Sequence, residues 1–266
     1  MIYVGTSGFS FEDWKGVIYP AALNKSVWLE FYERELGFRA LEINMTYYRL
    51  PSPTVFARMS QRTSPTFQFV VKAYKDMTHG LRDPVTGKLR DVKAVFERFI
   101  ACLAPLHGDG KLAGVLMQFP YSVKPSPEYI DYLRWARDLL APSELVVEFR
   151  NSAWARTEIM LLLRRLSIGY CAVDEPPLKG LMPFMPVCTS SIGYIRFHGR
   201  NTAWFHASAS ERYNYCYSEE ELRTFCAPIR TMAANAQQVF VFFNNCHAGH
   251  AARNALQLSR LLSADE

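Results

Sequence analysis

Eight short apolar runs recur along this chain, and nearly every one ends in a polar residue. Successive runs begin about 34 residues apart, which is the length of one strand–helix unit of a parallel sheet. An open doubly wound sheet more often stops at about five or six strands, whereas eight units close a barrel. The sequence therefore predicts an α/β fold, a TIM-type (β/α)8 barrel. Its strands are expected at residues 2–5, 40–44, 68–72, 114–118, 145–148, 170–174, 194–198 and 239–244.

Helical patterns fill most of the intervals between these runs. Apolar residues recur there at helical spacing, and the start signals are clearest at Ser52-Pro53 and at Ser218 with Glu221, which resembles a capping box. The segments with this pattern are 27–36, 91–106, 127–140, 153–166 and 251–262, together with the helices that open after Ser52 and Ser218. Alternation of strand and helix is typical of a parallel sheet.

Two segments depart from the regular pattern. Between Asp174 and Ile192 four prolines leave little room for a helix. The segment from Gly199 to Tyr217 is long and rich in aromatic and polar residues, which favours a lid. We therefore expect one irregular unit between strands six and seven and a lid candidate after strand seven.

Length, charge and cysteine usage limit the class of protein. The chain has 266 residues, and a TIM-type barrel typically needs about 250, so we expect residues 1–266 to form a single TIM-barrel domain. A formal charge of +5 suits an anionic, phosphate-bearing small molecule and is compatible with nucleic acid. The six cysteines are scattered, and neither a signal peptide nor an apolar stretch of about 20 residues is present. A cytoplasmic location without a membrane partner is expected; the oligomeric state stays open.

Side chains able to do chemistry gather where the expected strands end. In a parallel barrel these ends surround the mouth in which active sites lie. Glu42 and Asn44 are two residues apart and share one face of a strand, as do Arg196 and His198. The catalytic candidates are Glu42, Lys72, Glu148, Asp174, Arg196 and His198. The ligand-binding candidates are Asn44, Tyr48, Arg49, His79, Gln118, Arg150, Trp154, Arg200, Asn244, Asn245, Gly249 and His250.

The charges at the mouth allow two interpretations. Acids among cations stay ionised, and a lysine beside carboxylates stays charged, whereas a desolvated Lys72 is able to act as a base or nucleophile. The alternative is a buried ion-pair network that only holds the strand ends together.

A metal site is a further alternative. Glu42, Glu148, Asp174 and His198 would suit Mg²⁺ or Mn²⁺ better than Zn²⁺. The neighbouring lysine and arginine side chains repel a cation, so we predict no metal site and no cofactor, with Mg or Mn as the alternative.

The segment 244–250 joins the last strand to the last helix. Backbone amides at a helix start attract anions, and in many barrels the last two such loops hold a phosphate. We predict phosphate or sulfate near the amides of Ala248 to His250, within reach of Arg200 or Arg196. A simple turn with an N-cap is the alternative.

Several motifs resemble those of the YecE-like proteins, the family of domain of unknown function 72. They span almost the whole chain and include Gly5-Thr6-Ser7-Gly8, Glu42-Ile43-Asn44-Met45-Thr46-Tyr47-Tyr48-Arg49-Leu50-Pro51, Glu148-Phe149-Arg150, Arg196-Phe197-His198-Gly199-Arg200 and Phe243-Asn244-Asn245. The chain departs from the family pattern at Phe9, Tyr121 and Asn151. The resemblance implies a TIM-type barrel and supplies no reaction.

These features favour an enzyme of hydrolase, lyase or isomerase type. It would act at the barrel mouth on a phosphate-bearing small molecule or nucleotide-like ligand. Glu148 or Glu42 would be the general base, Lys72 and Arg196 electrostatic stabilisers, and His198 a proton donor. The alternatives are a nucleic-acid-binding or endonuclease-like barrel and a non-catalytic ligand sensor.

Overall fold

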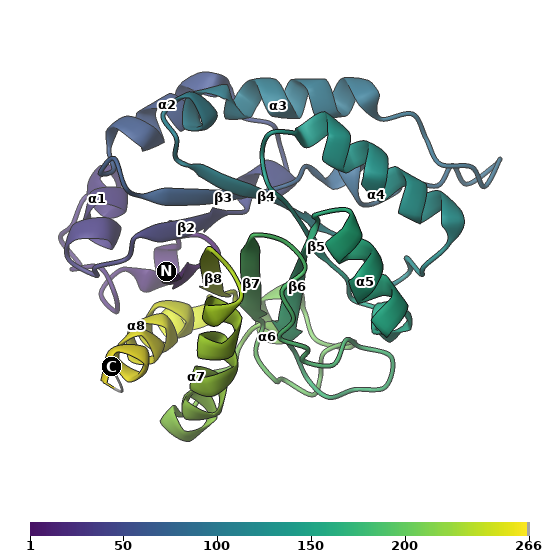
Figure 1. Cartoon of the computed structure of the whole chain (residues 1–266). Helices are drawn as coiled ribbons and strands as arrows, with labels where there is room; N and C mark the ends of the chain where they lie inside the picture. Colours follow the sequence, from purple (N-terminus) through teal and green to yellow (C-terminus); the bar gives the residue numbers. More distant parts are fainter. Residues whose placement is uncertain (265–266) are drawn as a thin grey trace.

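The computed structural model describes residues 1–264, apart from the side chains of residues 209 and 210. Parallel strands form one sheet that rolls into a nearly closed barrel (Figure 1). The sheet order is β1-β8-β7-β6-β5-β4-β3-β2, which confirms the predicted TIM-type architecture. The strands are β1 (Ile2–Thr6), β2 (Ala40–Ile43), β3 (Gln68–Lys72), β4 (Leu112–Gln118), β5 (Leu145–Glu148), β6 (Gly169–Asp174), β7 (Ile192–Phe197) and β8 (Gln238–Phe243).

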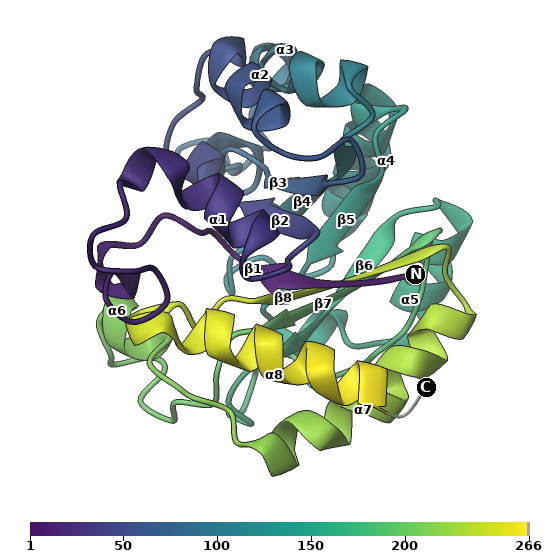
Figure 2. The ribbon, with the colours of Figure 1, turned by 90° about the vertical axis from the view of Figure 1, so that its left-hand side faces the viewer.

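Helices follow most strands and cover the outside of the barrel. Figure 2 shows α8 running alongside the paired strands β1 and β8 on the outside of the barrel. The α-helices are α1 (Trp28–Arg34), α2 (Pro53–Gln61), α3 (Lys93–Gly108), α4 (Pro127–Leu140), α5 (Thr157–Arg165), α6 (Ala209–Arg212), α7 (Glu219–Ala234) and α8 (His250–Ala264). Short 3-10 turns are η1 (Glu12–Trp14), η2 (Lys25–Val27), η3 (Met45–Tyr47), η4 (Lys75–Met77), η5 (Ser152–Trp154) and η6 (His247–Gly249).

The helix boundaries follow local backbone chemistry. The capping box of Ser218 and Glu221 opens α7 as predicted. The helix expected over 153–166 is instead divided into η5 and α5, because Ala155 takes a non-helical conformation (φ −77°, ψ 63°) between them.

The unit between β6 and β7 is irregular, as expected. All of residues 175–191 are described, and none of them is helical. The backbone N–H of Met182 donates to Glu175 Oε1 at 3.1 Å, and Ser152 N donates to Gly180 O at 2.9 Å. These bonds tie the segment to the carboxyl end of the barrel, where Leu181 and Met182 are buried.

The barrel closes between β1 and β2 with little strand pairing. A single bridge between Ser7 and Glu42 joins the two strands in the described part of the chain. The Tyr32 hydroxyl, from α1, accepts from Thr6 N at 2.9 Å and donates to Ala40 O at 3.2 Å. A side chain thus replaces ladder hydrogen bonds at the seam. Gly5 allows the close approach, since a Cβ there would lie 2.4 Å from Ala40 O.

Replacing Tyr32 with phenylalanine should lower the free energy of unfolding by about 1–3 kcal/mol, because the Thr6 N–H would be left buried and unpaired. Tyr170→Phe is the matched control: its hydroxyl is buried and has no hydrogen-bond partner among the described residues. That variant should keep or gain stability. Urea unfolding measures both, and equal losses in the two variants would contradict the bridging role of Tyr32.

Candidate active site

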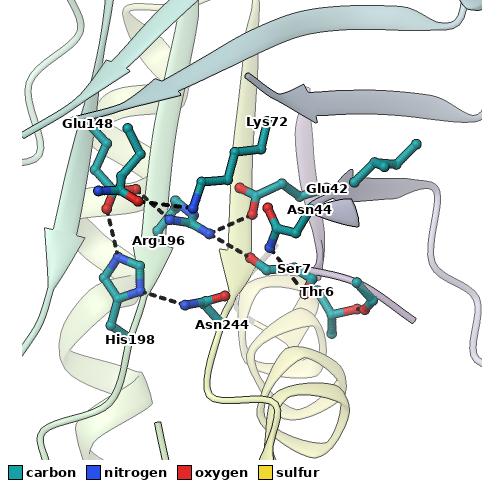
Figure 3. A network of polar contacts seen from close by, with 12 residues as sticks. Thr6, Ser7, Glu42, Asn44, Lys72, Glu148, Arg196, His198 and Asn244 are labelled. Atoms are coloured by element: carbon teal, nitrogen blue, oxygen red, sulfur yellow. Dashed lines mark hydrogen bonds and ion pairs between the residues drawn. The ribbon is translucent and has the colours of Figure 1, made fainter. Parts of the chain in front are cut away.

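A buried arginine connects three strands inside the barrel. Arg196 of β7 is 1% exposed, and its guanidinium pairs with Glu42 Oε1 of β2 at 2.7 Å and with Glu148 Oε2 of β5 at 2.6 Å (Figure 3). The second oxygen of Glu42 accepts from the Tyr194 hydroxyl at 2.7 Å. The polar ends of distant strands therefore converge, as side-chain parity predicted.

Glu148 is saturated by cations and donors. Besides Arg196, it accepts from Arg150 Nε at 2.5 Å and lies 3.3 Å from His198 Nε2. Burial alone would raise the pKa of this carboxyl, but Arg150 and Arg196 hold it well below its usual range. The Glu148 carboxylate is therefore suited to anchoring arginines rather than to accepting a substrate proton.

His198 is a neutral part of the same network. Burial, followed by the charge of Arg150, lowers the pKa of its imidazole to about 3. Nδ1 lies 3.0 Å from the Asn244 amide nitrogen and Nε2 faces Glu148 (Figure 3). Nε2 also lies 3.2 Å from Arg150 Nη2, so the ring contacts both partners of the Glu148–Arg150 ion pair. His198 is fully buried and is not among the residues that line the mouth cavity.

Unlike the charged groups of the buried network, Lys72 has no carboxylate partner in the described part of the structure. Its Nζ donates to the neutral Gln118 Oε1 at 3.0 Å and lies 4.6 Å from the centre of the Tyr47 ring. Burial and the neighbouring charge of Arg196 lower the pKa of this amine to about 7. A large share of Lys72 is therefore an uncharged amine at neutral pH.

A cavity of about 430 Å³ lies at this end of the barrel. Its charged lining groups are Lys72, Arg150 and Arg212, and none of the described lining residues is a carboxylate. Amides and aromatic rings complete the wall. The lining residues are Asn44, Tyr47, Tyr48, Lys72, His79, Gln118, Pro120, Tyr121, Arg150, Leu181, Trp204, Phe205, Arg212, Tyr213 and Asn244.

The family of the chain can now be stated. The family model described as "Protein of unknown function DUF72" matches residues 3–266. This chain belongs to the DUF72 family. The family description names no reaction, so the chemistry of this DUF72 protein has to be argued from its residues.

Three relatives match this chain over almost its whole length. The "UPF0759 protein YunF" of Bacillus subtilis (strain 168) is 29% identical over 277 residues, covering 100% of this chain and 96% of that protein. The crystal structure of a DUF72 family protein from Thermotoga maritima is 45% identical, covers 99% of both chains and has a TM-score of 0.91. One from Enterococcus faecalis is 26% identical, covers 99% of this chain and 96% of its own, and has a TM-score of 0.86.

The cavity of this DUF72 protein collects part of the predicted site. The predicted residues that line it are Asn44, Tyr48, Lys72, His79, Gln118, Arg150 and Asn244. Four further candidates, Glu42, Glu148, Arg196 and His198, form the buried network. Asp174 lies apart from that network, since its carboxylate pairs with Arg200 at 2.8 Å and accepts from the Tyr217 hydroxyl at 2.6 Å.

Three other residues predicted to bind the ligand do not line the cavity. Trp154 stacks on Phe149 with ring centroids 4.0 Å apart, and its indole N–H donates to Val123 O at 2.9 Å. Asn245 donates to Tyr215 O and to the buried Asn254. Arg49 is exposed and does not line the cavity.

The phosphate site expected near Gly249 and His250 is filled from within the chain. Ala248 N donates to Asp13 Oδ2 at 2.7 Å, so a protein carboxylate occupies the place expected for an anion. Arg200 is engaged by Asp174 and by Glu221 at 3.1 Å, while the position of Gly249 is packed against Ile18. Phosphate binding at this loop stays a prediction, and the described positive groups that line a cavity lie in the mouth.

The carboxylates predicted as ligands of the alternative Mg or Mn site are all paired with arginines. Glu42 and Glu148 are paired with Arg196, and Asp174 with Arg200. Within residues 1–264, side chains of His, Cys, Asp and Glu form no group of three or more placed to hold a metal ion. Separately, none of the described helices is long and apolar enough to span a bilayer.

Eight residues that line the cavity were not among the predicted site residues: Tyr47, Pro120, Tyr121, Leu181, Trp204, Phe205, Arg212 and Tyr213. Their segments have no strand or helix periodicity, so no pattern gives the direction of their side chains. The usable signal was the aromatic and polar richness of residues 199–217, which favoured a lid.

Glu148→Gln should lower the free energy of unfolding by about 3–5 kcal/mol, because Arg150 and Arg196 would lose a buried counter-charge. Glu219→Gln is the control, since it breaks an exposed ion pair with Arg223 and should cost at most about 1 kcal/mol. Chemical denaturation compares the two. Similar small losses would show that the buried network contributes little to stability.

Lys72→Met should be more stable than the natural chain below about pH 7, and this gain should shrink as pH rises toward about 10. The amine has a pKa of about 7 in the folded protein and about 10.4 in an unfolded chain. The unfolded state therefore binds more protons in this window, so the natural chain gains stability with rising pH while the variant lacks this term. Unfolding of both proteins across the window measures the difference; a difference independent of pH would contradict the lowered pKa.

Proposed function

We propose that this protein is an enzyme that binds a phosphate-bearing small molecule in the mouth cavity and transforms it with the amine of Lys72. One observation carries the proposal: the described lining residues provide cations, amides and aromatic rings but no carboxylate. Such a surface favours an anion and disfavours a cation. A volume of about 430 Å³ falls in the range of small-molecule sites, roughly 300–1,000 Å³.

The charges are arranged so that positive groups face the ligand. Glu42 and Glu148 lie below the cavity, where Arg196 and Arg150 neutralise them. Arg212 stands in the wall; none of the described carboxylates pairs with it, and its Nε is buried without a hydrogen-bond partner. A phosphate oxygen would supply that partner, and guanidinium groups bind phosphate well because of their planar array of donors.

The segment 199–217 supports a lid function. Trp204, Phe205, Arg212 and Tyr213 from this segment line the cavity. Its two ends are fixed at one carboxylate, because both Arg200 and Tyr217 bind Asp174. A loop anchored at its ends and carrying ligand contacts in its middle can close over substrate and exclude water. The aromatic rings would pack against a sugar or base.

The reaction class follows from the group that is free to react. The carboxylates expected as general bases are occupied by arginines, and Lys72 is the lining residue whose amine is partly uncharged at neutral pH. Proton abstraction or nucleophilic attack by Lys72 fits a lyase or isomerase better than a carboxylate-dependent hydrolase. A ligand sensor would bind in the same cavity without turnover.

Orthophosphate, a pentose phosphate and a purine nucleoside monophosphate should each raise the melting temperature, with the largest effect for the probe that also fills the aromatic wall. A probe at 100 times its Kd adds about 2.7 kcal/mol to folding. Arg212→Gln should weaken binding about tenfold, the equivalent of about 1.4 kcal/mol. Arg98→Gln, an exposed substitution on α3, should leave binding unchanged.

The same titration separates the competing functions. Stabilisation by a duplex oligonucleotide that exceeds the effect of every small phosphate would favour a nucleic-acid-binding barrel instead. The proposal would be contradicted by an absence of any shift with the small probes, or by equal losses in the Arg212 and Arg98 variants.

A further inference from the structure

We infer that Lys72 is a nucleophile that forms an imine with the carbonyl carbon of a small, phosphate-bearing aldehyde or ketone held in the mouth cavity. The inference rests on the proposed function and deepens it by naming the substrate class. It starts from the position of Lys72 and from the state of the groups around it.

The Lys72 amine lies in the cavity and has few polar contacts. Lys72 is the last residue of β3, and its side chain reaches the cavity from the strand end (Figure 3). Its polar contact is the neutral oxygen of Gln118, and a Tyr47 ring covers another side. A lysine that served only to balance charge would pair with a carboxylate. Here the two nearby carboxylates are paired with arginines: Glu42 with Arg196, and Glu148 with both Arg196 and Arg150.

The surroundings keep the amine nucleophilic. Desolvation and an adjacent cation are the two means by which proteins activate a lysine for attack on carbonyl groups. Both act here, because burial and Arg196 bring the pKa of Lys72 to about 7. At neutral pH the share of free amine is roughly a thousandfold larger than for an ordinary lysine with a pKa of about 10.4.

The covalent step is balanced without a further reagent. The Nζ lone pair attacks the carbonyl carbon, a C–N bond forms, and the carbonyl oxygen becomes a hydroxyl by taking one proton from the nitrogen. Loss of that hydroxyl with the second nitrogen proton releases one water and leaves the C=N bond. Nothing is oxidised or reduced. Arg212 would hold the phosphate, and the aromatic wall would keep bulk water from the imine.

The cavity also offers an acceptor for the intermediate. Asn44 lines the cavity, and its Oδ1 is buried without a hydrogen-bond partner among the described residues. A buried, unsatisfied amide oxygen costs free energy unless a ligand donor pairs with it. The hydroxyl of the carbinolamine, or a substrate hydroxyl next to the carbonyl, would be such a donor.

Reductive trapping tests the inference on the full chain. Glycolaldehyde phosphate is incubated with the protein and sodium cyanoborohydride at neutral pH, and the adducts are located by peptide mass spectrometry. Lys72 should be labelled at least about tenfold faster than exposed lysines such as Lys93, because of its larger share of free amine. Lys75→Met changes an exposed neighbour outside the cavity and should leave labelling at Lys72 unchanged, whereas Asn44→Ala should slow it.

Three outcomes decide between the two proposals. Labelling of Lys72 by glycolaldehyde phosphate well above labelling by glycolaldehyde supports both. Equal labelling by the two aldehydes supports the imine and contradicts phosphate binding. Labelling of Lys72 no faster than that of Lys93, in a protein that phosphate probes do stabilise, overturns the imine and leaves the proposed function standing.

Discussion

The contact of Arg196 with Glu42 and Glu148 is the interaction on which the arrangement of the mouth depends. One guanidinium inside the barrel joins β2, β5 and β7, no two of which are neighbours in the sheet order. Taking three charges out of water is costly, and their mutual attraction offsets the cost only if geometry and further hydrogen bonds are good. Tyr194, Arg150 and the neutral His198 provide those bonds. The network therefore fixes the relative positions of the strand ends with little freedom to move.

A second consequence concerns Lys72. Because arginines pair with Glu42 and Glu148, Lys72 is left without a counter-charge among the described residues. The same arginines then repel its charged form. The buried network and the lowered pKa of Lys72 are thus parts of one electrostatic arrangement. In the proposed function, the structural ion pairs would activate an amine that they do not include. This also reconciles the two interpretations that the sequence left open: the carboxylates belong to the network, and the lysine belongs to the cavity.

Prediction from sequence reached the fold and the convergence of strand ends, since both follow from regular periods. Spacing of apolar runs gives the strand number, and side-chain parity places Glu42 and Arg196 on the inside. Pairing within the barrel could not be predicted, because the partner of an arginine depends on the reach of side chains across the interior. Trp154 was predicted as a ligand contact, but its ring stacks on Phe149 and does not line the cavity. This packing, too, depends on a side chain whose position the sequence pattern does not give. The hydrogen bond from Ala248 N to Asp13 connects residues that are 235 positions apart. No local sequence pattern predicts such a contact.

The side walls of the cavity come mainly from loops, whereas its floor, the inner end nearest the buried network, comes from strand ends. Strand ends supply Lys72, Gln118 and the network beneath them, whereas the walls are built by the irregular segment after β6 and the long segment after β7. Loops change sequence and length without disturbing the packed core, so the wall is able to vary while the amine and its electrostatic support stay in place. Because the residues beneath the cavity are saturated with internal ion pairs, the choice of substrate in the proposed function would reside mainly in the loops. Residues such as Leu181, Phe205 and Arg212 would determine which phosphate-bearing molecule is admitted, and Lys72 would determine what happens to it.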